Sequence, residues 1–410
     1  MKKSLGVLWL VVFVDLVGFG VASFPINFVV EQMGAASFWK TFAGPGVFSL
    51  LQFISAPLWG RASDAYGRKP ILFFSMLGSA LAYIGLMNAH SLEALVVARA
   101  VGGIMSGNIS AAFAYATDVT GFANRAKGLG VVGSAFGLGF AVGPALGGYL
   151  GVDSAGHASM LYPALVSAVL SSVACVSVFF FLQESLPPES RKPWSAAAAA
   201  PGGVATGGQT ATRVLLAQPK LLALIVVGLI VSVGTAAMQT AYPFWARDTF
   251  GYQLPQIGLQ FLVLALLSAA GQGGMVGPVV KRLGEKGAAM LSIAGLAAGL
   301  GIMAIAHQSW EMWLGLIVFG AFFGLLTPAL NSLVSFQAEP NNRGAVMGFS
   351  QSASSLGRII GPAISGPLYD GLGHYAPFML AAALAVVGGL LLTRIPRHQP
   401  APAATASSPL

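Results

Sequence analysis

The sequence is poor in charge: Asp, Glu, Lys and Arg together make up only 8% of its 410 residues. This is about a third of the usual share, and it is too little to cover the surface of a water-soluble protein of this length. Cysteine is almost absent, since Cys175 is the only one, which excludes a scaffold of disulfide bonds. No His-Glu-x-x-His motif or other catalytic or metal-binding constellation occurs, so the sequence gives no support for an enzyme, a metal site or a cofactor.

Apolar side chains are abundant instead, at 56% of the chain with a mean hydropathy of +0.77, which excludes a disordered protein. A membrane-spanning helix needs about 20 mostly apolar residues, and 53 glycines are typical of closely packed membrane helices. We therefore expect an all-α polytopic membrane protein. Its twelve predicted spans lie near residues 5–30, 41–60, 70–89, 94–117, 128–151, 158–183, 221–246, 254–280, 287–307, 312–337, 344–369 and 372–393.

The basic side chains predict the orientation. With the N-terminus in the cytoplasm, seventeen of the 21 Lys and Arg residues fall on the cytoplasmic side, and only Lys40 and Arg247 fall outside. Arg99 and Arg358 lie within spans, while the carboxylates divide evenly, with Asp15 alone in a span. Such an excess of basic residues is typical of cytoplasmic loops. The net charge of +8 thus reflects topology, and it gives no support for binding nucleic acid.

One long connection divides the chain. Residues 184–217 are rich in Pro, Ala, Gly and Ser, which is the composition of a linker. We expect an N-terminal six-helix bundle over residues 1–183, a cytoplasmic linker over 184–217 and a C-terminal six-helix bundle over 218–395. The tail, residues 396–410, is expected to be disordered.

The two halves repeat. The segment RAKGLGVVGSAFGLGFAVGPALGG, which begins at Arg125, aligns without a gap with RGAVMGFSQSASSLGRIIGPAISG, which begins at Arg343. At this offset of 218 residues, Gly139, Gly143, Pro144 and Gly148 coincide with Gly357, Gly361, Pro362 and Gly366. Six-helix halves in parallel repeat are the architecture of rocker-type secondary transporters, which bind substrate near the midplane between the halves.

Several motifs carry a family resemblance: GRASDAYGRKPIL at residues 60–72, RAVGGIMSG from Arg99, AYATDVTGFANRAKG from Ala114, GLGFAVGPALGG at 137–148, and QES before the linker. Together they resemble the major facilitator superfamily, in particular the proton-coupled drug antiporters related to tetracycline efflux proteins. The resemblance implies the twelve-helix major facilitator fold in a bacterial cytoplasmic membrane, with both termini in the cytoplasm. It also implies a monomer that needs no cofactor and exports small amphiphilic or lipophilic compounds in exchange for protons.

Two residues within spans are candidates for proton coupling. Asp15 lies about 16 Å along the first helix, near mid-membrane, where an acid is costly and therefore a functional candidate; it also resembles the helix 1 aspartate of tetracycline exporters. Its alternative role is helix packing through neighbouring hydroxyls. Arg99 lies too far from the depth of Asp15 for a direct pair. It either lines the cavity and influences a nearby acid, or bonds to backbone carbonyls of helices 1 and 4.

The motif at residues 60–72 predicts a cytoplasmic gate. In the superfamily, the acid at the Asp64 position faces the positive N-terminus of helix 11, here near Asn342–Arg343. Arg68 and Lys69 are expected to pair with Asp118. The full set of predicted gating residues is Gly60, Asp64, Gly67, Arg68, Lys69, Asp118 and Arg125. The alternative is an ordinary positively charged cytoplasmic loop.

The glycines of the fifth helix predict a close helix contact. Gly139, Gly143 and Gly147 recur at every fourth residue and so share one face, and Pro144 is expected to kink the helix. We expect this face to form a tight seam with the eighth helix that prevents leak.

Polar and aromatic residues within spans are candidates for substrate binding: Asn27, Gln52, Asn108, Gln239, Tyr242, Trp245, Gln260, Gln272 and Arg358. Each has an alternative role as a helix–helix hydrogen bond or a lipid-interface anchor. The alternative function is a metabolite exporter or facilitator without proton coupling, in which Asp15 would be structural.

Overall fold

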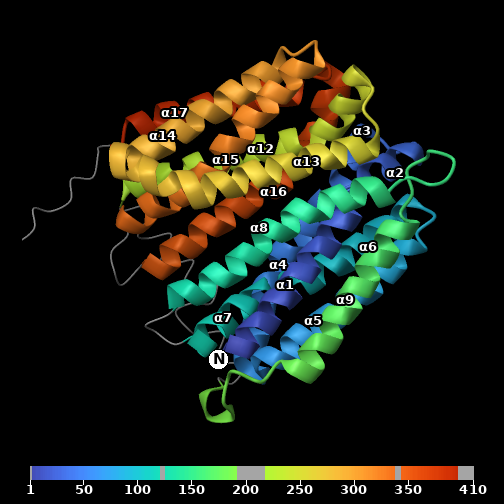
Figure 1. Ribbon diagram of the computed structural model, residues 1–410, viewed down its shortest axis with the longest axis vertical. Helices are drawn as coiled ribbons and strands as arrows, with labels where there is room; N and C mark the ends of the chain where they lie inside the picture. Colours follow the sequence, from blue (N-terminus) through green and yellow to red (C-terminus); the bar gives the residue numbers. More distant parts are fainter. Residues whose placement is uncertain (1, 121–124, 192–217, 338–342, 396–410) are drawn as a thin grey trace, which may run out of the picture.

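The computed structural model describes residues 2–120, 125–191, 218–337 and 343–395, and every statement below refers to these ranges. Their regular elements are helices, apart from one isolated bridge between Val152 and Ala158. Figure 1 shows two groups of helices side by side, one formed by α1 to α9 and the other by α12 to α17.

The first half contains six spans, two of which are interrupted by irregular turns. Its helices are α1 (Lys2–Ser23), α2 (Ile26–Gln32), α3 (Ser37–Thr41), the π-helix η1 (Phe42–Gly46), α4 (Val47–Tyr66), α5 (Arg68–Met87), α6 (Leu92–Met105), the 3₁₀ turn η2 (Ser106–Asn108), α7 (Ile109–Thr120), α8 (Arg125–Leu150) and α9 (Leu161–Phe181). The second span consists of α3, η1 and α4, and the fourth of α6, η2 and α7. A short 3₁₀ turn, η4 (Pro188–Ser190), follows α9.

The second half also contains six spans. Its helices are α12 (Pro219–Phe250), α13 (Leu254–Ala270), the π-helix η5 (Gly271–Met275), α14 (Val276–Ala304), α15 (Ser309–Gln337), α16 (Arg343–Leu372) and α17 (Ala376–Thr393). Helix α14 contains one non-helical residue, Gly284, with φ 70° and ψ 172°. This residue ends the eighth span and begins the ninth.

The predicted twelve-helix fold is confirmed. Ten described segments are long and apolar enough to span a membrane, and one of them, residues 254–304, holds two spans joined at Gly284. The 30-residue helix α16, which contains two prolines, is a further span and brings the number of spans to twelve. The protein is therefore a multi-pass membrane protein. The connection expected between the spans near 41–60 and 70–89 is shorter than predicted, because α4 continues to Tyr66 and α5 starts at Arg68, so that Gly67 alone connects them.

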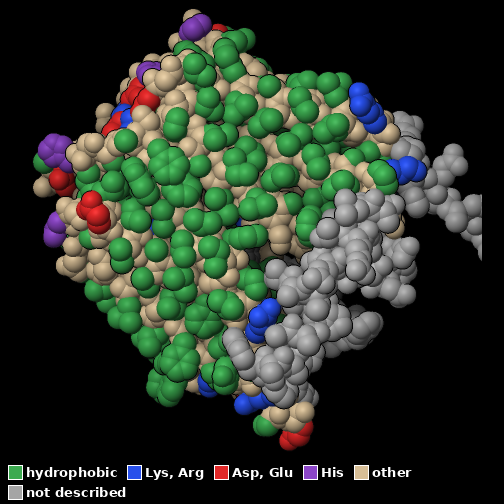
Figure 2. Space-filling view, turned by 180° about the vertical axis from the view of Figure 1, so that it is seen from behind, with side chains coloured by type: hydrophobic (Ala, Val, Ile, Leu, Met, Phe, Trp, Pro, Cys, Tyr) green, Lys and Arg blue, Asp and Glu red, His purple; other side chains and the backbone are tan. Residues whose placement is uncertain are grey.

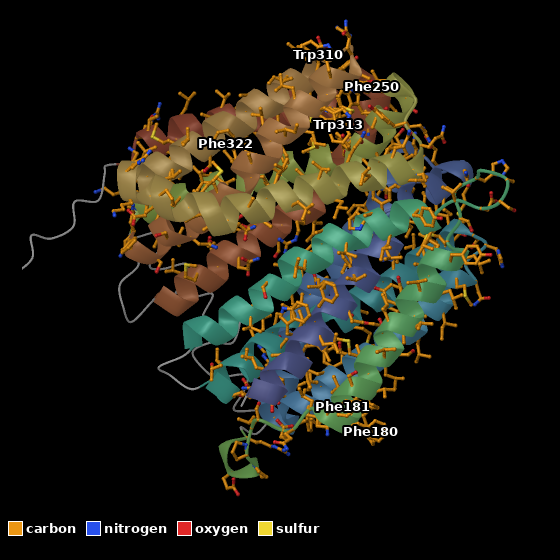
Figure 3. The ribbon with its side chains drawn as sticks, in the orientation of Figure 1. Phe180, Phe181, Phe250, Trp310, Trp313 and Phe322 are labelled. Carbon is orange, nitrogen blue, oxygen red and sulfur yellow. The ribbon has the colours of Figure 1, made fainter. Side chains whose placement is uncertain are left out.

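Charged and apolar side chains occupy different parts of the surface. Hydrophobic side chains cover the middle of the face in Figure 2, while Lys and Arg gather toward one end and most Asp, Glu and His toward the other. The exposed rings of Phe180 and Phe181 lie at one end of the molecule, and Trp310 lies near the other (Figure 3). Aromatic side chains at both ends are typical of the two membrane–water interfaces.

We name the two ends for reference. The terminal side carries the start of α1, the end of α17, and the joints at Gly67 and Gly284. The opposite side carries α2, α3 and the connection between α12 and α13. In Figure 1 the two halves converge at the opposite side and diverge toward the terminal side.

Candidate functional site

Asp15 lies inside the first half, at a small apolar cavity between α1, α5 and the fourth span. The cavity has a volume of about 10 Å³, close to the space that one water molecule needs. It is lined by Val11, Val12, Asp15, Leu16, Leu72, Met76, Asn108, Ile109 and Ala112. Among the described residues, no hydrogen bond or ion pair reaches the Asp15 carboxyl. If Asp15 only packed helices, its carboxyl would bond to neighbouring hydroxyls, and no such bond is observed among the described residues.

Asn108 borders this cavity where the fourth span is interrupted. The turn η2 separates α6 from α7 at this depth, and the Asn108 amide donates to the hydroxyl of Ser75 on α5. A 3₁₀ stretch within a helix often marks a functional hinge. The acid thus lies beside an irregular point of the first half, where a small shift of α7 relative to α6 would change its surroundings.

Arg99 is buried and bonded within the first half. Its Nη2 donates to the hydroxyl of Ser23 at 2.8 Å, and its Nε donates to the carbonyl oxygen of Gly44 at 3.3 Å. The guanidinium also lies over the rings of Phe48 and Phe19, 4.7 and 5.6 Å from their centres. Its partners belong to the first and second spans, which corrects the expectation of carbonyls from helices 1 and 4.

The two halves are joined at the opposite side by a network of charged side chains that the sequence did not reveal. Arg247 of α12 donates to both carboxylate oxygens of Glu31 on α2, at 2.5 and 3.1 Å. Lys40 of α3 lies 3.1 Å from Asp370 of α16 and 3.5 Å from Glu31. Acids and bases therefore alternate across the boundary between the halves, and the network closes this side.

Further groups hold this network in place. Asp248 accepts from Nε of Arg247 at 2.7 Å and from the hydroxyl of Tyr369 at 2.8 Å. The Arg247 guanidinium also lies over the adjacent rings of Phe28 and Phe244, 5.1 and 5.5 Å from their centres. These rings shield one surface of the cation from water, which strengthens its ion pairs.

Glycines allow the helices to approach closely, but the partner differs from the one predicted for the fifth helix. A Cβ on Gly143 would lie 2.7 Å from the Cα of Gly20, and one on Gly139 would lie 2.6 Å from the Cβ of Leu16, so this face packs on α1. Gly147 likewise packs on Val21 of α1. The expectation that these three glycines form the seam with the eighth helix is therefore wrong.

A seam between the fifth and eighth spans does exist, on a neighbouring face of α8. A Cβ on Gly148 would lie 3.0 Å from the Cα of Gly258, and one on Gly258 would lie 2.9 Å from the carbonyl oxygen of Pro144. The repeat-related Gly366 packs in the same way on the other half, where a Cβ would overlap the carbonyl oxygen of Ser37. Gly148 and Gly366 are therefore paired close-contact points between the halves.

At the terminal side, Gly67 and Glu184 form a compact joint. Gly67 has a φ of 104°, which favours glycine, and a Cβ there would overlap the carboxylate of Glu184. Glu184 accepts from the backbone N–H groups of Arg68 and Lys69 at 2.9 and 3.1 Å. A carboxylate at a helix N-terminus is stabilising, so Glu184 caps α5.

The predicted gating residues are partly brought together at this joint. Arg68 contacts Asp64 at 2.5 Å and Asp118 at 3.2 Å, and it donates to the hydroxyl of Ser63 at 2.7 Å. Lys69 does not pair with Asp118 as expected, because its Nζ donates to the carbonyl oxygen of Phe179 at 2.8 Å. Gly60 lies in α4, and a Cβ there would only touch Ser110. Asn342 and the side chains of Arg343 and Arg125 lie outside the described residues, so the expected pairing of Asp64 with the start of α16 stays a prediction.

This geometry gives a prediction for Asp64. We expect Asp64→Asn to slow transport severalfold while leaving substrate affinity within about twofold, because Asp118 and Ser63 still hold Arg68 in the fold. Partly exposed ion pairs contribute only about 0–1 kcal/mol to stability, so the melting temperature should stay nearly unchanged. Transport rate and affinity measured on the same preparation test this, with Glu189→Gln, an exposed acid on the same side, as the control. An equal loss of affinity and rate would contradict a gating role.

The candidate substrate residues divide into two groups. Six are held within their own half. Gln52 donates to the carbonyl oxygen of Ser106, Tyr242 donates to Gln260 at 2.9 Å, Asn108 contacts Ser75, Trp245 packs on Phe378, and Asn27 is buried beside Gly44. The hydrogen bonds of Gln52, Asn108, Tyr242 and Gln260 match the helix–helix alternative. Among the described residues, the buried Asn27 Oδ1 and Trp245 Nε1 have no hydrogen-bond partner. Gln239, Gln272 and Arg358 retain partly or largely exposed side chains.

This fold and site define a class of protein. Two repeated six-helix halves contain an acid in the membrane interior and close against each other at one side, which is the architecture of a secondary transporter rather than an enzyme. Within the described ranges, no group of three His, Cys, Asp or Glu residues could hold a metal ion.

Comparisons with known proteins also indicate a transporter. The sequence matches the family described as "Major Facilitator Superfamily" over residues 8–286 and 247–409. It is 31% identical to the tetracycline resistance protein, class C, of Escherichia coli over 323 residues, which is 79% of this chain and 78% of that protein. It is 29% identical to the major facilitator superfamily domain-containing protein 10 of Mus musculus over 369 residues, 85% of this chain and 77% of that protein.

Solved structures show the same fold. The crystal structure of the human organic anion transporter MFSD10 (TETRAN) superimposes with a TM-score of 0.70 and 24% identity, covering 95% of this chain and 99% of that one. The nucleoside transporter NupG gives a TM-score of 0.75 at 12% identity with the same coverage. The chain belongs to the Major Facilitator Superfamily.

Proposed function

We propose that the protein exports small amphiphilic compounds in exchange for protons, by alternating access across a bacterial cytoplasmic membrane. The observation that carries this proposal is Asp15, a carboxyl in the membrane interior with no ion-pair partner among the described residues. Such a group can take up and release a proton, and intramembrane acids commonly form proton relays in transporters. The tetracycline resistance relatives support a role in drug efflux.

The conformation of the structure corresponds to one state of such an alternating-access transporter. The charge network and the glycine seams close the opposite side, whereas the facing surfaces of α8 and α16 are uncovered toward the terminal side. At Gly133, Gly137 and Gly348, no described atom beyond the glycine's own stretch of helix lies within 4 Å of an added Cβ. With the terminal side in the cytoplasm, substrate enters from the cytoplasm in this state. Arg99 then acts as a positioning residue that fixes α1 against the second and fourth spans.

The functional unit in this proposal is one chain, because both halves of the pathway come from it. We assign residues 1–183 and 218–395 to the two bundles, 184–217 to the cytoplasmic linker and 396–410 to the tail. Residues 192–217 and 396–410 lie outside the described residues.

The proposed orientation leads to a prediction. Reporter fusions after residue 200 should behave as cytoplasmic, and fusions after residue 250 as external, because the basic residues gather on the side of the linker. Alkaline phosphatase, active only outside, and a cytoplasmic fluorescent protein provide complementary signals. The reverse pattern of signals would overturn the orientation.

Transport assays test the function itself. The purified protein in proteoliposomes should accumulate amphiphilic compounds against their gradient when a pH gradient is imposed, and a protonophore should abolish this accumulation. Accumulation that is insensitive to the protonophore would favour the alternative, a facilitator or exporter without proton coupling. Liposomes with Asp15→Asn protein serve as the matched control.

A further inference from the structure

Helix α16 carries a row of side chains that face the boundary between the halves. Gln351, Arg358, Ser365 and Tyr369 are spaced by seven, seven and four residues and therefore share one side of the helix. On one flank of this row, Gly357 and Gly361 pack on α12. On the other flank, Gly366 packs on α3 of the first half. The row thus faces the space that α12 and the first half enclose.

This row is covered at one end only. Ser365 and Tyr369, toward the opposite side, are buried, and their hydroxyls donate to Ala237 and Asp248 of α12 at 2.8 Å. Arg358 and Gln351, toward the terminal side, are exposed. Because the covered and uncovered residues share one side of the helix, Arg358 lies where the space between the halves opens.

Arg358 forms no ion pair with any residue that the structure describes. Its Nη2 donates to the hydroxyl of Ser355 at 2.8 Å, and no carboxylate among the described residues lies within 4 Å. A guanidinium has five N–H donors, so most of them are available. Arg358 is the middle of the 30-residue helix α16, about 22 Å from either end, where an unpaired cation is costly and marks a substrate or ion pathway. Arg99, the other cation at membrane depth, is instead buried and donates to Ser23 and Gly44 of its own half.

The first half presents a different surface at the repeat-related position. The residue 218 positions before Arg358 is Phe140 of α8, which is 45% exposed. The counterparts of Gln351 and Ser355 are Gly133 and Gly137, where an added Cβ would meet no other described segment within 4 Å. At equivalent positions of the repeat, α16 therefore presents a cation and polar groups, whereas α8 presents an aromatic ring and glycines.

We propose that Arg358 binds the anionic group of the substrate, and that the transported compounds are amphiphilic organic anions whose apolar part packs against Phe140. This inference rests on the proposed export function and specifies its substrate class. A carboxylate matches the fork of the guanidinium and accepts two parallel hydrogen bonds. Phe140 and the glycines beside it provide a flat apolar surface for the remainder of the molecule.

The test compares an acid with its neutral counterpart. The probes are 1-naphthylacetate and 1-naphthylacetamide, which share shape and differ in charge, together with a short series of other aromatic acids and their amides. Binding to the purified full-length protein in detergent is measured by calorimetry and thermal stabilisation. We expect the wild-type protein to bind acids about 10–100-fold more tightly than amides, as hydrogen bonds to a charged group suggest. Arg358→Gln should remove this preference, and Arg358→Lys should retain part of it.

Phe140→Ala is the second variant, and it should weaken acids and amides equally. Because the wild-type preference is measured without any variant, a failure of Arg358→Gln to fold does not remove the test. Absence of acid preference throughout the series would overturn the proposal, as would equal weakening of both probes by Arg358→Gln. The assay uses no proton gradient. Proton-driven export of neutral or cationic compounds without acid preference would refute the anion proposal alone, while acid preference without proton dependence would refute only the coupling.

Discussion

Replacing Asp15 with Asn is expected to abolish uphill, proton-driven export while leaving substrate binding measurable. Asn preserves the size of the side chain but cannot exchange a proton. No second carboxylate lies in a predicted span to take over this role. The accumulation ratio across a liposome with an imposed pH gradient should fall to about one, although exchange between two substrate pools can persist.

The structure gives this expectation its physical basis. The cavity at Asp15 is apolar and small, so a charged carboxylate receives little solvation there. Its walls include Leu72 of α5 and Asn108 of the broken fourth span. Protonation would therefore alter the packing of three spans at once, which couples the proton to the conformation of the first half.

Three measurements on one preparation decide the role of Asp15: folded yield, substrate affinity against pH, and protonophore-sensitive accumulation. The pH dependence of affinity should flatten in Asp15→Asn, because binding of proton and substrate is linked. Glu93→Gln, which removes an exposed acid on α6, is the control and should behave as wild type. If folded Asp15→Asn protein still accumulates substrate in a protonophore-sensitive way, Asp15 is not the coupling residue. Parallel loss of folded yield and all transport would instead support a packing role.

Gly366→Ala is expected to shift the protein toward conformations that are open at the opposite side. The added Cβ overlaps the carbonyl oxygen of Ser37 and comes within 2.8 Å of the hydroxyl of Thr41, which itself donates to the carbonyl oxygen of Pro362 at 2.6 Å. Both partners lie in the short helix α3, and Thr41 is also held by its bonds to Pro362 and to the N–H of Gly366, so they cannot move aside freely. Overpacking costs about 1–3 kcal/mol, which corresponds to a change of about 5–150-fold in the equilibrium between conformations.

The matched control is Gly371→Ala on the same helix, since an added Cβ there would meet no other described part of the chain within 4 Å. Spin labels at Ala36 and Leu372, exposed on the two halves, report the separation at the opposite side. The native Cys175 is buried, so introduced cysteines can be labelled selectively. Gly366→Ala should lengthen this distance and slow transport at least fivefold, whereas Gly371→Ala should change neither. Identical distance distributions in the two variants would refute the role of Gly366 in closure.

The sequence predicted much of the fold because membrane helices are encoded locally. Long apolar runs and the 218-residue repeat identified the twelve spans and the two equivalent halves. The pairing of Arg68 with Asp118 was also anticipated, from the resemblance of its motif. In each case the signal lies within one segment or in the comparison of two.

Contacts between distant segments were less predictable. A glycine face indicates that some helix approaches closely, but it does not say which, so Gly139 and Gly143 were assigned to the eighth helix although they pack on α1. The ion pair of Lys40 with Asp370 joins residues 330 positions apart, and in the sequence both appear only as charges at helix ends. Tyr242 and Gln260 satisfy each other within the second half, because a polar side chain in a span can face either a neighbouring helix or the cavity.

Gly67 and Gly284 each join two consecutive spans so tightly that the two helices cannot move independently at the joint. Each is a single residue of positive φ between two long helices, and the two positions are 217 residues apart, so both halves contain the same short elbow. One residue spans at most about 3.6 Å, so α4 cannot tilt at this end without carrying the start of α5 with it. Helix α5 in turn supplies Leu72 and Met76 to the cavity of Asp15. Movement of α4 at the membrane surface is therefore transmitted through Gly67 and α5 to the residues that line the cavity of Asp15.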